Sequence, residues 1–451
     1  MDAIRAGMAR DGGLFVPQEW PTLTAREPVA VAPYADVAAH VLSAFAGEDV
    51  GAEEATRLTH GAYGAARSFP PPITPLVQTG PGVWRLELIH GPSLSFKDVA
   101  MQLIGPLYDL AMERAGARAT IVCATSGDTG GAAVEALKNR TRVDLFVLTP
   151  KGRVSDVQRR FMTTSGAGNV HVLELDTDFD ACQAIVKALF ADGDFALRAA
   201  LSGVNSINWA RIVAQSVYFH IAAHALSAPG PVSFVVPTGN FGDAYSGWVA
   251  KHMGAPIGRI LIATNANDIL ARALNTGRYE RAVTSRATLS PAMDIQVASN
   301  FERILFEALD RDGAHVRRLY EGFSQSGGFD IPKPALERLR TDFSAVAISD
   351  DETEQTIARA WTEGHFICPH TAVGQRALES RAPVFDHRPV VTLATAHPAK
   401  FPDTVEHATG VRPALPQRCA DLFGREERFE RLPADAELVK RYIQERTREW
   451  R

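Results

Sequence analysis

A lysine in a turn between two ordered segments is the first residue whose position suggests chemistry. Lys97 lies in the segment 91–98 (GPSLSFKD), directly after the apolar run 83–89. A turn lysine is usually a solvated surface charge, but an amine held near other polar loops can form an imine with an aldehyde. Lys97 is therefore a candidate nucleophile if other reactive loops converge on it.

Two glycine-containing loops each follow an apolar run and precede a helical segment. They are residues 124–131 (ATSGDTGG) and residues 237–243 (PTGNFGD). Small residues let the backbone approach a ligand, and a helix N-terminus offers free N–H groups to an anion. Neither loop carries the Walker lysine or the G-x-G-x-x-G dinucleotide fingerprint. Taken alone, each is as typical of a plain strand-to-helix turn as of a phosphate cradle.

A further polar segment, residues 395–402 (TAHPAKFP), closes the last apolar run of the chain. A Thr395 hydroxyl at the carboxyl end of a strand would face the crevice where open α/β sheets bind ligands. A reactive lysine, a phosphate cradle and a lone hydroxyl match the aldehyde, the phosphate and the pyridine nitrogen of pyridoxal phosphate. The sequence therefore predicts this cofactor.

These segments require an α/β framework to bring them together. Short apolar runs separated by helical segments predict strands at 83–89, 120–124, 143–148, 170–175, 232–236, 259–264 and 390–395. Continuous apolar runs of this kind indicate parallel sheets flanked by helices on both faces.

Four parts of the chain differ in pattern. The first seventy residues are helical and end at three prolines, which cannot continue a helix. Residues 266–364 are helix-rich, charged and poor in signals for buried strands. We expect an N-terminal helical segment at 1–72, a cofactor-binding α/β core of two lobes at 73–265, a helical insertion at 266–364, and at 365–451 the completion of the core plus C-terminal helices.

Composition limits the possible partners. The chain has 451 residues and a formal net charge of −5, which disfavours nucleic acid as a partner. Its four cysteines form no C-x-x-C pair, and no histidines pair at metal-ligand spacing, so we predict no metal site. The N-terminus lacks a secretory pattern, and no apolar run is long enough to span a bilayer. We expect a cytoplasmic monomer or homodimer that binds a small molecule and no membrane.

Taken together, the motifs resemble those of the threonine synthase family. The segment 86–98 looks like the family's cofactor-lysine motif, with Ile89, Ser93 and Ser95 in place of the more usual Phe, Thr and Ala. The insertion and the segment 293–297 are similar to the longer microbial and fungal branch. Further likeness lies in residues 11–17, 125–130, 205–211, 239–243, 299–303 and 395–401.

The resemblance implies a fold type II enzyme, similar to the tryptophan synthase β subunit. Such an enzyme would convert O-phospho-L-homoserine and water to L-threonine and phosphate by γ-elimination and β-replacement. Lys97 would hold pyridoxal phosphate as a Schiff base, and Thr395 would contact the pyridine nitrogen. The cofactor phosphate would be bound by Gly239, Asn240, Phe241 and Asp243. The substrate carboxylate or the ring hydroxyl would face Ser126, Gly127, Asp128 and Thr129.

The leaving phosphate requires a cationic pocket, for which arginine is well suited because its donors form a bidentate fork. Basic residues gather between 151 and 160, and Arg211 follows the segment 205–210. We therefore name four candidate ligands for this phosphate: Lys151, Ser155, Asn208 and Arg211.

Other functions stay open at this point. A threonine-synthase-like phospho-lyase would release 2-oxobutyrate, and a serine or threonine dehydratase is a weaker form of the same alternative. The insertion and the segment 205–211 favour the synthase over the dehydratase. An inactive cofactor-binding homologue is disfavoured by the intact Lys97, Asn240 and Thr395, and a nicotinamide-dependent dehydrogenase by the missing glycine fingerprint.

Overall fold

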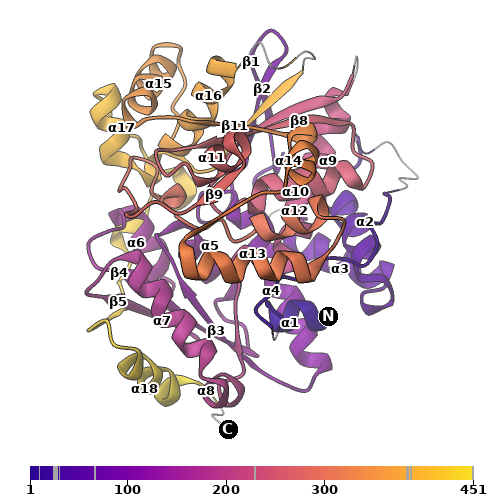
Figure 1. The fold of residues 1–451 in the computed structure, drawn as a ribbon. Coiled ribbons are helices and arrows are strands. Elements are labelled where there is room, and N and C mark those ends of the chain that lie inside the picture. The colour runs from indigo at the N-terminus through magenta and orange to yellow at the C-terminus, as the bar shows by residue number, and fades with distance from the viewer. Residues whose placement is uncertain are drawn as a thin grey trace.

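A six-stranded sheet forms the larger of two lobes (Figure 1). The computed structural model describes residues 1–9, 11–23, 29, 31–64, 68–227, 230–381, 385 and 389–448. Every strand pair in this sheet is parallel except the hairpin of its first two strands. The strand order is β1 (Leu76–Gly80), β2 (Val83–Glu87), β12 (Val390–Ala394), β7 (Val232–Pro237), β8 (Ile257–Thr264) and β11 (Phe343–Ala347).

A five-stranded parallel sheet forms the smaller lobe. Its order is β13 (Glu430–Leu432), β5 (Val170–Leu175), β4 (Val143–Pro150), β3 (Ala119–Ala124) and β6 (Leu201–Ser202). Every residue of β3 and β4 is buried, as is every residue of β7 in the larger sheet. Parallel strands covered by helices on both faces have this continuous burial, so the predicted α/β class with parallel sheets is confirmed.

Helices cover both sheets and connect the lobes (Figure 1). The N-terminal helices are α1 (Asp2–Ala6), α2 (Tyr34–Ala46) and α3 (Ala52–Tyr63); α2 and α3 pack on each other, and α2 also packs on α9 (Trp209–Leu226). Long helices α4 (Lys97–Arg114) and α10 (Gly242–His252) also contact α9. The small lobe carries α5 (Asp128–Leu137), α6 (Asp156–Thr163), α7 (Phe179–Ala191), α8 (Gly193–Arg198) and α18 (Ala436–Arg446). Completing the large lobe are α16 (Pro369–Arg381) and α17 (Pro402–Thr409).

The segment 266–364 is helix-rich, but it also contributes a strand to the main sheet. Its helices are α11 (Ile269–Thr276), α12 (Phe301–Ala308), α13 (Gly313–Ser326), α14 (Lys333–Asp342) and α15 (Asp350–Thr362). Two short strands distant in sequence, β9 (Arg278–Glu280) and β10 (Gly328–Asp330), form a separate antiparallel sheet. Strand β11 lies parallel to β8 at the sheet edge. Strand β11 was not predicted because its sequence, FSAVA, alternates buried and partly exposed residues and lacks a continuous apolar run.

Aromatic packing joins this segment to the loop after β7. Tyr279 stacks on Phe301 with ring centroids 4.9 Å apart, and Phe301 meets Phe241 edge to face at 5.8 Å. Phe241 also lies 5.3 Å from Phe343 of β11. Such close-packed rings leave the loop little freedom to move.

No helix in the described ranges is both long and apolar enough to cross a membrane. All four cysteines are buried and free of disulfide bonds. Burial strongly raises the pKa of Cys123 and Cys182, to about 12 in each case. These thiols are therefore packing groups rather than nucleophiles at neutral pH.

Candidate active site

A cavity of about 1540 Å³ opens where loops from both lobes meet. Four of its walls are loops that follow the parallel strands β2, β3, β7 and β12. These loops contribute Lys97, Thr395 and most residues of the segments 125–129 and 237–243. The carboxyl ends of parallel strands are the usual ligand-binding edge of an open α/β sheet.

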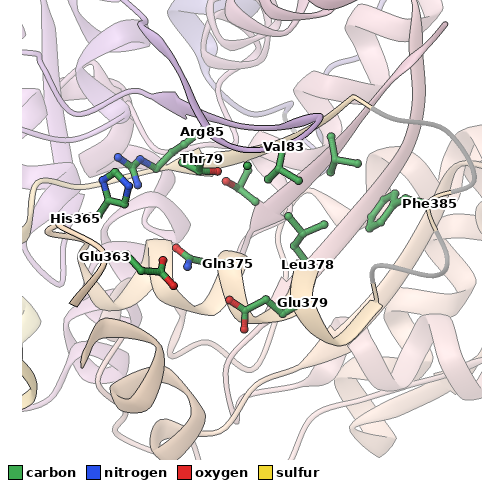
Figure 2. A pocket seen from close by; sticks show the side chains of 12 residues that line it. Thr79, Val83, Arg85, Glu363, His365, Gln375, Leu378, Glu379 and Phe385 are labelled. Atoms are coloured by element: carbon green, nitrogen blue, oxygen red, sulfur yellow. The ribbon is translucent and has the colours of Figure 1, made fainter. Parts of the chain in front are cut away.

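A second cavity of about 270 Å³ lies between strands β1, β2 and β12 and helix α16 (Figure 2). Arg85 and His365 lie near each other at one end of it, and Leu378 and Phe385 lie toward the other. Arg85 is already paired with Glu87 at 3.1 Å, and no lysine is among the residues that line this cavity. The larger cavity is therefore the candidate active site.

Lys97 is the first residue of α4, and its amine lies near a buried carboxylate. Its Nζ is 3.5 Å from Oδ2 of Asp128 and 4.6 Å from the ring centroid of Phe96. Burial lowers the pKa of Lys97 below its ordinary value, the charges of Arg211 and Lys400 lower it further, and Asp128 opposes this. The lower pKa enlarges the fraction of free amine, which is the form that attacks an aldehyde.

Asp98 fixes the loop that carries Lys97. Its carboxylate accepts hydrogen bonds from the backbone N–H of Ser93 at 2.9 Å, the Ser93 hydroxyl at 2.6 Å and the backbone N–H of Ser95 at 3.2 Å. The side chain is fully buried, and burial raises its pKa to about 6. A Cβ on Gly91 would lie only 2.3 Å from Cβ of Asp98, so this turn requires glycine.

Asp128 opens helix α5 at the other side of the cavity. Its Oδ1 lies 2.8 Å from Nζ of Lys400 and accepts a hydrogen bond from Nε2 of Gln158 at 3.0 Å. Burial acts to raise the pKa of Asp128, but Lys400 and Lys97 outweigh burial and hold it well below its usual range. This carboxylate is therefore ionised throughout the neutral range.

The loop between β7 and α10 has the form of a phosphate cradle. Phe241, the N-cap of α10, is left-handed with φ 63°, and a Cβ on Gly239 would lie 3.1 Å from Cα of Met293. Within the described chain, no hydrogen bond leaves the backbone N–H of Gly239, Asn240 or Phe241. The first N–H groups of a helix also lack intrahelical acceptors, so several donors are free to bind one anion.

Two buried side chains beside this cradle have unpartnered polar atoms. Oδ2 of Asp243 and Nε of Arg211 are buried without a hydrogen-bond partner, and both residues line the cavity. Tyr218 donates a hydrogen bond to Oδ1 of Asp243, and burial raises the pKa of Asp243 to about 7. Burial lowers the pKa of Arg211 to about 10. Unsatisfied buried groups at a cavity wall are typical of a ligand site.

Thr395 completes the residues that fit the cofactor. It follows β12, is buried, and its carbonyl accepts the backbone N–H of Phe96 at 2.9 Å, which ties the β12 loop to the lysine loop. The Lys97 amine, the N–H donors of the cradle and the Thr395 hydroxyl thus lie at one cavity. They match the aldehyde, the phosphate and the ring nitrogen of pyridoxal phosphate, respectively.

Comparison with known proteins agrees with this geometry. Three family descriptions match the chain: "Threonine synthase N terminus" at residues 1–63, "Pyridoxal-phosphate dependent enzyme" at 72–396 and "Threonine synthase, C-terminal" at 371–443. A threonine synthase of Pseudomonas aeruginosa is 44% identical over 98% of this chain and 94% of its own length. The chain belongs to the threonine synthase family.

Solved structures of the family share the fold. The threonine synthase of Brucella melitensis, determined with pyridoxal phosphate bound, is 49% identical with a TM-score of 0.93 over 99% of this chain and 96% of that one. The yeast threonine synthase is 36% identical with a TM-score of 0.91 over 99% and 95% of the two chains. The fold is therefore fold type II and the cofactor is pyridoxal phosphate, as the sequence motifs predicted.

The structure brings most of the predicted site residues of this family member to the cavity. Gly127 and Phe241 are not among the lining residues, but both of their chain neighbours are. Gly127 has φ 130°, and a Cβ there would lie 2.5 Å from the Gln158 side chain. The lining includes Lys97, Ser126, Asp128, Thr129, Arg211, Gly239, Asn240, Asp243 and Thr395.

Three of the predicted phosphate ligands are not among the lining residues. Lys151 is half-exposed and lies 3.7 Å from Asp176. Ser155 caps helix α6 and donates its hydroxyl to the carbonyl of Lys400 at 2.7 Å. Asn208 is fully buried and donates to the carbonyl of Ile4 at 2.9 Å. Ser155 and Asn208 thus already have hydrogen-bond partners, whereas Lys151 has only a loose exposed one, and a phosphate-binding role for these three residues stays a prediction.

Sequence reasoning gave no role to two residues that the structure places at the site. Lys400 belongs to the segment 395–402 (TAHPAKFP), for which only Thr395 was given a role. In the structure Lys400 is fully buried against Asp128. His370 lines the cavity, and its Nε2 accepts the backbone N–H of Ala292 at 3.1 Å. Burial lowers the pKa of His370 to about 4, so the ring is neutral. The only sequence signal for Lys400 is its place in the polar segment that follows the last predicted strand.

Proposed function

We propose that this cavity converts O-phospho-L-homoserine and water into L-threonine and phosphate. The observation that carries the proposal is the Lys97 amine of lowered pKa, which faces strand-end loops in a chain that matches threonine synthases along nearly its whole length. Bound pyridoxal phosphate supplies an electron sink for negative charge at the substrate carbons. The protein must hold it, bind the substrate and move protons.

Lys97 has two tasks in this proposal. It holds the cofactor through its amine, and once released it takes the proton from Cα of the substrate. A general base works best when its pKa lies near the working pH, and burial brings the pKa of Lys97 closer to that range. Asp128, 3.5 Å away, keeps the amine oriented toward the cavity.

The cradle after β7 would hold the cofactor phosphate through Gly239, Asn240, Phe241 and Asp243. Its free N–H donors support this assignment, as does the close approach that Gly239 permits. Thr395 would meet the pyridine nitrogen with a neutral hydroxyl. A hydroxyl leaves that nitrogen less protonated than a carboxylate would, which favours elimination and replacement over transamination.

The substrate carboxylate would bind at the N-terminus of α5, where Ser126 and Thr129 offer hydroxyl and N–H donors. Gly127 would shape this turn, since its own N–H donates to the Thr125 hydroxyl at 3.0 Å. The ionised Asp128 repels a second carboxylate, so its side chain orients Lys97 rather than the substrate. Arg211 is the predicted phosphate ligand that remains at the cavity wall, and its unpartnered Nε supports that role.

The test is product analysis with purified protein and O-phospho-L-homoserine. We expect threonine and phosphate in equal amounts, and no turnover for Lys97→Ala. Phosphate together with 2-oxobutyrate would instead show the phospho-lyase reaction. Light scattering of the same sample would settle whether the enzyme is a monomer or a homodimer.

A further inference from the structure

Lys400 is a buried lysine that does not line the cavity. Its side chain has no exposed surface, and its Nζ lies 2.7 Å from the Ser93 carbonyl and 2.8 Å from Oδ1 of Asp128. The amine also lies 5.6 Å from the ring centroid of Phe161. A lysine buried this deeply is stable only when its charge is paired, and here the pair is Asp128.

Asp128 stands between two lysines. Its Oδ1 is held by Lys400 and by Gln158 at 3.0 Å, while its Oδ2 faces the Lys97 amine at 3.5 Å. One negative charge is thus shared by two positive ones. If Asp128 faced Lys97 alone, its whole attraction would favour the protonated amine. Lys400 offsets that attraction from the side away from the cavity.

We propose that Lys400 is a positioning and charge-balancing residue for Lys97: it anchors the far oxygen of Asp128, so that the near oxygen orients the Lys97 amine without fixing it as an ammonium ion. This inference rests on the proposed role of Lys97 in holding the cofactor. The anchor itself is rigid, because the Ser155 hydroxyl donates to the Lys400 carbonyl at 2.7 Å.

Other charged groups face these two lysines, and their titration limits the useful pH range. Burial raises the pKa of Asp98 to about 6 and that of Asp243 to about 7, while burial lowers the pKa of His370 and His397 to about 4. Burial lowers the pKa of Arg211 to about 10. Between pH 8 and 9 the solution lies above the raised pKa of the carboxyl groups and below the lowered pKa of Arg211, so a change in the reactivity of Lys97 reports mainly on its own protonation.

The experiment measures the acetylation of Lys97 in the full chain after removal of the cofactor. Trace acetic anhydride labels only free amines, and mass spectrometry gives the rate for the Lys97 peptide relative to that of the exposed lysine Lys333. At pH 8 we expect Lys400→Met to slow labelling by about tenfold or more, since one neighbouring charge shifts such an equilibrium by at least that factor. Asp128→Asn should accelerate it.

Lys440→Met is the matched control. Lys440 also pairs with two carboxylates, Asp192 at 2.8 Å and Glu437 at 2.7 Å, but it lies on α18. Labelling of Lys97 should change by less than about twofold in this variant, because the charge removed lies on another helix, is only partly buried and is screened by solvent. An equally large effect in the control would overturn a specific role for Lys400.

Opposite signs for Lys400→Met and Asp128→Asn would support the inference, because general loosening of the site would move both rates in one direction. A change in the same direction, or none for Lys400→Met, would overturn it. Should Lys400→Met alone not fold, the double variant with Asp128→Asn removes both buried charges. Its labelling should be slower than that of Asp128→Asn, because the repulsion by Lys400 is also lost, and an equal or faster rate would overturn the charge-balancing role.

Cofactor capture separates this inference from the proposed function. The unaltered chain should regain its imine absorbance when pyridoxal phosphate is added, and Lys400→Met should regain it more slowly at pH 8. Capture at a residue other than Lys97 would overturn the proposed function. Normal capture on Lys97 with equal rates in both proteins would overturn only the role of Lys400.

Discussion

Replacing Gly91 by alanine should disrupt the turn that presents Lys97. A Cβ at this position would lie 2.3 Å from Cβ, 2.5 Å from Oδ2 and 2.7 Å from Cγ of Asp98. Real contacts of a Cβ are essentially never this short, so either the turn or Asp98 must move. Asp98 is fully buried and accepts three hydrogen bonds from Ser93 and Ser95, so it cannot rotate away without losing them.

The cost combines two effects. Overpacking of a core costs about 1–3 kcal/mol, and each hydrogen bond lost adds about 1 kcal/mol. We therefore expect Gly91→Ala to lower the free energy of unfolding by about 2–4 kcal/mol, measured by urea titration, and to weaken cofactor retention. Gly61→Ala in helix α3 is the control, because a Cβ there meets nothing within 4 Å. Equal unfolding free energies for Gly91→Ala and the unaltered protein would refute this account of the turn.

Three further predictions concern the cofactor site. Gly239→Val should weaken pyridoxal phosphate binding by about tenfold or more, because even a Cβ would lie 3.1 Å from Cα of Met293. Equilibrium dialysis measures this affinity, and an unchanged value would place the cofactor phosphate elsewhere. Burial raises the pKa of Asp243 from 3.8 to about 7, so the folded state binds this proton more tightly and stability is lost as the pH rises from about 4 to 7. Asp243→Asn mimics the protonated acid, so urea titrations without cofactor should show a smaller loss between pH 5 and 8 than in the unaltered protein; an equal loss would refute the assignment. Lys97→Ala should abolish both turnover and the imine absorbance band, and residual activity would move the nucleophile to another residue.

Much of the core could be predicted from sequence because its strands are continuous apolar runs. Strands β3, β4 and β7 are buried along their whole length, and each was expected within one or two residues of its observed bounds. Strand β11 was missed because an edge strand with one partly exposed face has a weaker apolar pattern. Its sheet partner, β8, is distant in sequence, and pairing of that kind leaves no local signal.

The residues of the candidate site were likewise predictable only in part. Loops at strand ends can be recognised in sequence, so the convergence of Lys97, Gly239 and Thr395 on one cavity was predictable, and their roles there stay predictions. The partners of an isolated polar residue are not readable, because they depend on how distant segments meet. Ser155 and Asn208 are predicted phosphate ligands whose side chains bond to Lys400 and Ile4, which lie 245 and 204 residues away, and no sequence pattern indicates those partners.

The central claim is that the amine of Lys97 joins the aldehyde of pyridoxal phosphate in the cavity between the lobes. Borohydride reduction of the purified holoenzyme, followed by peptide mass spectrometry, tests it most directly. We predict a single pyridoxyl adduct, located on the peptide that contains Lys97. An adduct on another lysine, or none at all, would contradict the account.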